Sequence, residues 1–107
     1  MFAFLSRLHQ GRKLSRLYLR LARDNEAAFW EEIKRRVAGM SPAEAQAYVA
    51  TRAAQFLHPI VDKLLAEDSS LNAAIGPTLI VKSAEMLTEQ ILTHRLKATP
   101  RHGPKAA

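Results

Sequence analysis

The sequence predicts an all-α protein, a small bundle of four to five helices with a helical hairpin at residues 39–44. Three observations support this fold class. Apolar residues recur every three or four positions through most of the chain, which is the spacing of a helix face. The one β-branched cluster, TLIV at 78–81, continues directly into such a pattern. With 107 residues, 48% of them apolar, the chain has the size and composition of one domain with a modest core.

Residues 1–97 are expected to form this single domain. The last ten residues, 98–107, contain proline, glycine and basic residues without any periodicity, so we expect a mobile basic tail.

The first helical segment is predicted over residues 2–10, and Gly11 is expected to interrupt it. From Arg12 onward the chain is strongly amphipathic, with an apolar stripe of leucines at 14, 17 and 21. A second stripe contains Phe29, Ile33 and Val37 and is rotated by roughly 120° from the first on a straight helix.

Two arrangements can produce this rotation. Either the helix breaks at Asp24 or Asn25, both good N-cap residues, or one long helix contacts different neighbours along its length. The absence of glycine and proline between Arg12 and Val37 favours one helix over 12–38.

Residues 39–44 contain the clearest signals for the end of one helix and the start of the next. Gly39 suits the position just after a helix, and Ser41-Pro42-Ala43-Glu44 is a capping box with proline at the first helical position. A turn this short predicts that the two flanking helices form an antiparallel hairpin. The helix that starts at Pro42 keeps its apolar phase through Pro59, so we expect one kinked helix to about Ala66.

The last helix is predicted from about Pro77 to Lys97, after a turn at residues 67–70. Its apolar stripe is wide and its polar face is narrow. This helix is therefore expected to be the central one or to have two packing partners.

Catalytic, cofactor and metal motifs are not found in the sequence. There is no cysteine, and the four glycines are isolated, so thiolate chemistry and the usual phosphate-binding loops are excluded. His58 and Asp62, and likewise Glu85 and Glu89, share a helix face but match no metal motif, and we interpret both pairs as solvated. His94 is expected to be partly buried or at an interface. We therefore predict a protein that is not an enzyme and needs no cofactor or metal.

Charge is distributed unevenly along the chain, whose formal net charge is +6. Residues 1–23 contain six lysines or arginines and no acid, whereas residues 41–90 contain three basic and six acidic residues. After Glu89 no acid follows, while four basic residues do. This asymmetry indicates an acidic partner: nucleic acid, an acidic protein surface or an anionic membrane.

The strongest functional signal is a row of arginines, which we call the arginine row: Arg12, Arg16, Arg20 and Arg23. On a helix they fall within an arc of about 80°. Like charges at this spacing repel, and the planar guanidinium group binds phosphate or carboxylate through two hydrogen bonds. We predict that the row, supported by Arg7 and Lys13, docks on a polyanion, with the nucleic-acid backbone as the favoured partner. The alternative is pairing within the fold, with Glu44, Glu67, Glu85 or Glu89.

Lys34, Arg35 and Arg36 form a second basic cluster in the last turn before Gly39. There they complement the helix dipole, which explains them without a partner.

Two other functions fit the sequence. The chain could be a structural or adaptor subunit of a larger assembly, or a homo-oligomer, with an interface at Phe2, Phe4, Leu19 and Trp30. Trp30 alternatively belongs to the core. A peripheral membrane protein is also compatible, since an apolar opening precedes the basic helix. We expect a cytoplasmic protein, with the mitochondrial matrix as the alternative because no acid precedes Asp24.

Overall fold

A computed structural model describes the backbone of residues 2–96 and the side chains of residues 14–96. Within that range the fold is all-helical, which confirms the predicted class, and no strand is present. The expected four to five helices are wrong: residues 2–96 form three α-helices and two short helical turns. They are α1 (Phe2–Val37), α2 (Pro42–Glu67), the 3₁₀ turn η1 (Ala73–Ile75), α3 (Gly76–Gln90) and the π-helical turn η2 (Ile91–Arg95).

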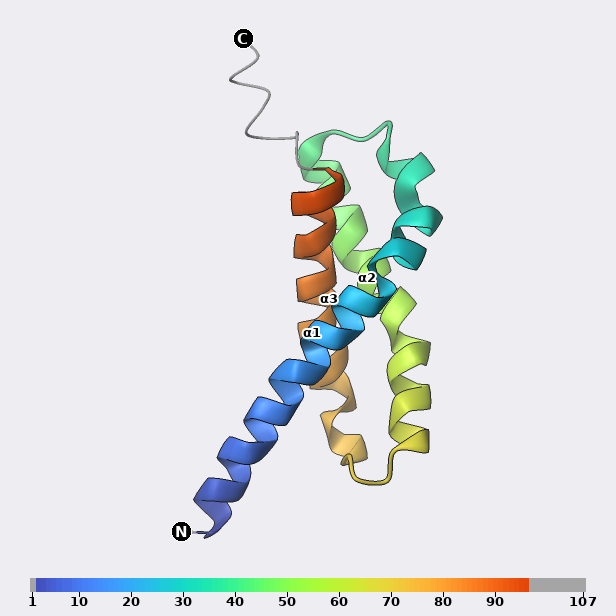
Figure 1. The fold of residues 1–107 in the computed structure, drawn as a ribbon. Coiled ribbons are helices and arrows are strands. Elements are labelled where there is room, and N and C mark those ends of the chain that lie inside the picture. Colours follow the sequence, from blue (N-terminus) through green and yellow to red (C-terminus); the bar gives the residue numbers. More distant parts are fainter. Residues whose placement is uncertain (1, 97–107) are drawn as a thin grey trace.

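The count is lower mainly because α1 is one continuous helix of 36 residues. The break expected at Gly11 does not occur: a single glycine inside a helix costs only about 1 kcal/mol, which neighbouring turns offset. The single helix predicted over 12–38 is confirmed, with its end at Val37. Its N-terminal part extends beyond α2 and α3 (Figure 1).

The rotation between the two apolar stripes of α1 is explained by two sets of neighbours. Leu17 and Leu21 pack in a small cluster with the buried Val61 and Leu79. Further along, α1 contributes to the larger core cluster, whose buried members are Ala22, Phe29, Ile33, Val37, Ala45, Val49, Ala53, Leu57, Ala84, Leu87 and Ile91. One helix therefore contacts different partners along its length, as the second of the two arrangements predicts.

The capping box between α1 and α2 is present. The Ser41 hydroxyl accepts a hydrogen bond from the Glu44 N–H at 3.2 Å, and the Glu44 carboxylate accepts one from the Ser41 N–H at 2.9 Å. Pro42 is the first residue of α2. The two helices run in opposite directions on either side of the turn (Figure 1), although each packs more extensively on α3 than on the other.

α2 remains helical through Pro59, as predicted, and ends at Glu67. Pro59 lies on the exposed side, where the missing hydrogen bond leaves a carbonyl group near solvent. Asp68 closes the helix, and its carboxylate accepts a hydrogen bond from the Ser70 N–H at 3.0 Å.

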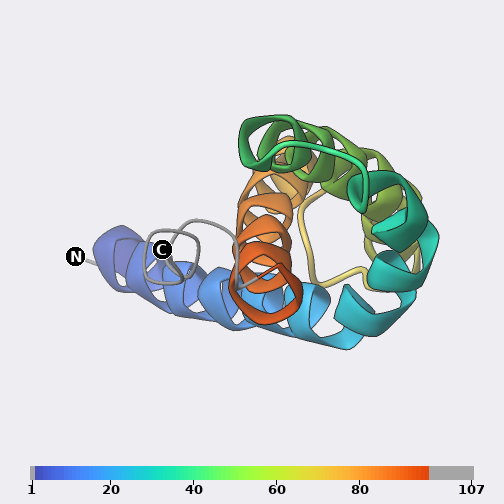
Figure 2. The ribbon, with the colours of Figure 1, turned by 90° about the horizontal axis from the view of Figure 1, so that it is seen from above.

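α3 is the central helix, in agreement with its narrow polar face, because it packs on both α1 and α2 (Figure 2). Its regular part is shorter than expected: α-helical geometry stops at Gln90 and a π turn follows. At the other end, Gly76 is buried, and a Cβ atom there would lie 3.2 Å from Leu65 Cδ1. Glycine thus allows α3 to begin close to the end of α2.

Candidate polyanion-binding surface

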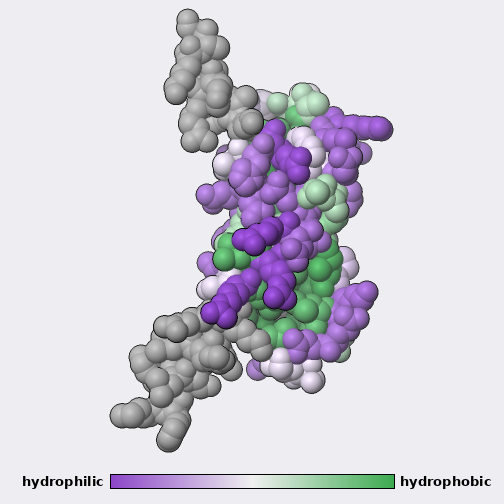
Figure 3. Space-filling view, in the orientation of Figure 1, coloured by the Kyte–Doolittle hydropathy of each residue, from purple (hydrophilic) through white to green (hydrophobic). Residues whose placement is uncertain are grey.

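Three members of the arginine row can be placed, and all three are exposed. Arg16, Arg20 and Arg23 lie along the middle of α1, where strongly hydrophilic side chains form a band (Figure 3). The side chains of Arg7, Arg12 and Lys13 lie outside the described residues.

No carboxylate among residues 14–96 forms an ion pair with Arg16, Arg20 or Arg23. Asp24, one turn from Arg20, is exposed and does not pair with it. Of the internal partners considered from the sequence, Glu44 caps α2, and Glu85 lies 3.8 Å from the Lys82 ammonium. Glu67 and Glu89 do not pair with the row either. Within the described residues, neutralisation by the fold is therefore not observed.

The predicted interface residues have different environments. Leu19 lies among the arginines and is 42% exposed. Trp30 is half-buried against the larger core cluster, and the Arg95 guanidinium carbon lies 6.0 Å from the centroid of its ring. Trp30 thus combines core packing with a cation–π contact. Phe2 and Phe4 have side chains outside the described residues.

The second basic cluster behaves as an ordinary helix end. The Lys34 ammonium lies 2.7 Å from a Glu31 carboxylate oxygen, and this hydrogen bond is the main cause that lowers the pKa of Glu31. Arg35 and Arg36 are exposed in the last turn of α1.

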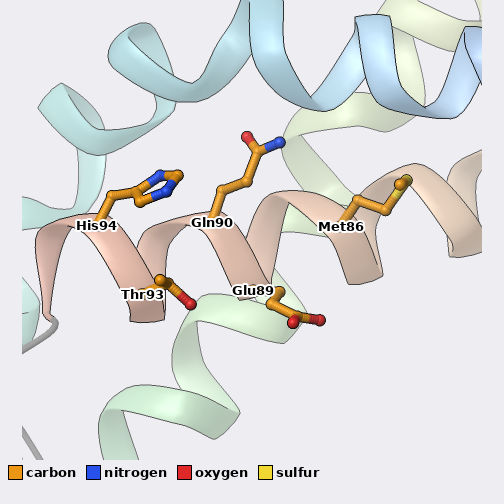
Figure 4. Close-up of a pocket in the computed structure, with 5 residues that line it drawn as sticks. All are labelled: Met86, Glu89, Gln90, Thr93 and His94. Atoms are coloured by element: carbon orange, nitrogen blue, oxygen red, sulfur yellow. The ribbon is translucent and has the colours of Figure 1, made fainter.

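A polar junction between α1 and the end of α3 was not predicted from the sequence. The Glu26 carboxylate, whose side chain is only 17% exposed, lies 3.1 Å from Arg95 Nε and 3.4 Å from His94 Nδ1. With its amide oriented to donate, Gln90 Nε2 lies 3.1 Å from Glu26 Oε1. Met86, Gln90 and His94 all point towards α1 (Figure 4).

Glu26 is separated in the sequence by 68 positions from His94 and by 69 positions from Arg95. No local sequence pattern could therefore reveal this junction. The i, i+4, i+8 spacing of Met86, Gln90 and His94 was the available signal for a shared face. The His94 side chain is 60% exposed, which corrects the expectation of partial burial. Because it contacts Glu26 of α1, His94 lies at the interface between α1 and the π turn that follows α3.

His58 and Asp62 form an exposed pair at 3.2 Å, as expected from their spacing. No group of three potential metal ligands occurs between residues 14 and 96. None of the described helices combines the length and the apolar character needed to cross a bilayer.

Comparison with known proteins adds no relative: no family model, curated protein or solved structure matches this chain. The exposed arginines of α1 are therefore the basis for a functional proposal.

Proposed function

We propose that this chain is a non-catalytic binding protein that docks on the sugar–phosphate backbone of nucleic acid through the arginine row. The observation that carries the proposal is the exposure of Arg16, Arg20 and Arg23 without an ion pair to any described carboxylate. A positive surface of this kind attracts phosphates, and each guanidinium group makes charge-assisted hydrogen bonds to phosphate oxygens.

The helix spaces these contacts regularly. With a rise of 1.5 Å per residue, Arg16 and Arg20 are about 6 Å apart along α1, and Arg16 and Arg23 about 10.5 Å. The row consists of arginines alone, so it lacks the asparagine or glutamine that would read adenine, although arginine itself can bind a guanine edge through two hydrogen bonds. We expect phosphate contacts to dominate binding, with at most a preference for guanine.

The test is the salt dependence of binding to a labelled duplex, measured by fluorescence anisotropy. Three neutralised phosphates give a slope of about −3 in a plot of log K against log salt concentration. Arg16→Glu/Arg20→Glu should weaken binding by at least about tenfold and make the slope less steep by about 2.

The matched control is Arg35→Glu/Arg36→Glu, which makes the same charge change on the same helix but outside the row. It should retain most of the affinity. A flat salt dependence, or equal losses in the two variants, would contradict the proposal.

A second candidate, an anionic membrane surface, is favoured by Leu19, which is 42% exposed among the arginines. Apolar side chains also gather beside the hydrophilic band, between α1 and the C-terminal half of α2 (Figure 3). Such a combination is typical of an interfacial surface. Binding to anionic but not neutral vesicles, weakened by Leu19→Ser, would favour this candidate. The same substitution should leave duplex binding unchanged.

A further inference from the structure

Two large apolar side chains are exposed within residues 14–96, and they lie in oppositely charged surroundings. Leu19 is 42% exposed and is accompanied by the arginine row on α1. Val81 is 53% exposed and lies on α3, where Glu85 and Glu89 follow one and two turns later.

Val81 borders a groove between α2 and α3, which we call the acidic groove. Its volume is about 510 Å³, and it is lined by Gln46, Ala50, Ala54, Val81, Ala84, Glu85, Thr88, Glu89 and Leu92. The alanines have short side chains and leave room for an apolar side chain from outside. Glu85 and Glu89 are exposed, and Glu89 points away from α1 in Figure 4.

The spacing of charges matches on the two surfaces. Glu85 and Glu89 are four residues apart, as are Arg16 and Arg20, so each pair spans about 6 Å along its helix. Two arginines of one helix can therefore face two glutamates of another while an apolar side chain lies beside them. Within one copy, no ion pair of the described residues joins these two surfaces.

We propose that the acidic groove binds the arginine row of a second copy of this chain. Leu19 of one copy contacts Val81 and the alanine floor of the other, and Arg16 and Arg20 pair with Glu85 and Glu89. For Glu85 to pair with an arginine of the second copy, its contact with Lys82 must break. It is 3.8 Å long and both side chains are more than half exposed, so it contributes little stability.

This interface joins two different surfaces, so in a pair one copy keeps a free acidic groove and the other keeps a free arginine row. Association of this type produces closed rings or open chains, according to the rotation between neighbours. It also covers the arginine row, so nucleic acid and a second copy compete for the same arginines.

The experiment is sedimentation equilibrium of the full chain over a range of protein and salt concentrations. We expect association that weakens as salt rises, because exposed ion pairs are screened. Arg16→Glu/Arg20→Glu and Glu85→Lys/Glu89→Lys should each weaken self-association by at least about tenfold. The variant with all four substitutions, and an equimolar mixture of the two double variants, should associate again because opposite charges face each other.

Asp62→Lys/Glu67→Lys is the control for total charge, since it makes the same change as Glu85→Lys/Glu89→Lys at residues that do not line the groove. It should associate more strongly than Glu85→Lys/Glu89→Lys. Circular dichroism of each variant establishes that the helices are intact.

Failure of this inference is distinguishable from failure of the proposed function. Glu85→Lys/Glu89→Lys retains the arginine row and should still bind the duplex, although it no longer self-associates. A chain that is monomeric at all concentrations and at low salt would overturn the inference. So would association that the charge reversals leave unchanged, or that the four-substitution variant fails to restore.

Discussion

The two described parts of α1 differ sharply in what their side chains contact. Residues 14–23 bury Leu21 and Ala22 but expose Leu19 and the arginines. Residues 26–37 bury Phe29, Ile33 and Val37 in the larger cluster. The C-terminal part of α1 is therefore held in the larger core cluster, whereas its middle exposes the arginines and Leu19, which we propose contact a partner.

Truncation of Phe29 should cause the largest loss of stability and so test the difference between the two parts of α1 most directly. Phe29 is 1% exposed, and its ring centroid lies 5.3 Å from that of Phe56. Phe29→Ala removes a ring from the larger cluster and should lower the free energy of unfolding by about 3–5 kcal/mol, measured by urea denaturation. Leu19→Ala, on the same helix, should change it by less than about 0.5 kcal/mol. Similar losses in both variants would show that the two parts of α1 contribute equally to stability.

Leu79 tests the small cluster that supports the middle of α1. It is fully buried, but several of its apolar neighbours, including Leu17 and Leu64, are only partly buried. These neighbours can rearrange into part of the space, so Leu79→Ala should cost about 2–3 kcal/mol, towards the lower end for buried leucines.

The loss in the free energy of unfolding is measured by urea denaturation. Leu57→Ala, in the larger cluster, is the matched comparison. A larger loss for Leu79 than for Leu57 would show that the small cluster packs more tightly than the partial exposure of its neighbours implies.

Sequence reasoning succeeded where the determinant is local. Residue type and spacing alone predict three features: the capping box at Ser41 and Glu44, the continuity of α2 through Pro59, and the exposed pair of His58 and Asp62. It failed at Gly11, because a local signal for a break was weaker than the propagation of the helix around it.

The candidate site was predicted in part for the same reason. The arc that contains Arg16, Arg20 and Arg23 is a property of one helix, so the sequence could define it. The junction of Glu26 with Gln90, His94 and Arg95, and the acidic groove between α2 and α3, depend on how helices distant in sequence pack. Neither has a local signature.

The Ser41 cap should have a smaller effect than either core residue. Ser41→Ala removes the acceptor for the Glu44 N–H and leaves one N–H at the start of α2 to be satisfied by water. The expected loss in unfolding free energy is about 1 kcal/mol by urea denaturation. Ser69→Ala, in the exposed turn after α2, should change stability by less than about 0.5 kcal/mol. If both variants were equally stable, the capping box would not contribute.

The smallest effect concerns the pH dependence of the same cap. The Ser41 backbone N–H, and next the Ser41 side chain, hydrogen-bond with Glu44 and lower the pKa of its carboxyl group below the ordinary value of 4.5. Because this pKa is lower in the folded chain, the cap stabilises the fold above pH 4.5 and loses that contribution as the pH falls through the folded pKa.

Glu44→Gln keeps a side-chain acceptor but cannot titrate. The stability of the wild type relative to this variant should therefore decline as the pH is lowered from about 6 to about 3, in urea denaturation at several pH values. An NMR titration of the Glu44 side chain locates the pKa directly. In Ser41→Ala it should rise only part of the way to 4.5, because the backbone N–H of residue 41 remains as a donor. A Glu44 pKa at or above 4.5 in the wild type would show that the carboxylate does not accept this hydrogen bond in solution.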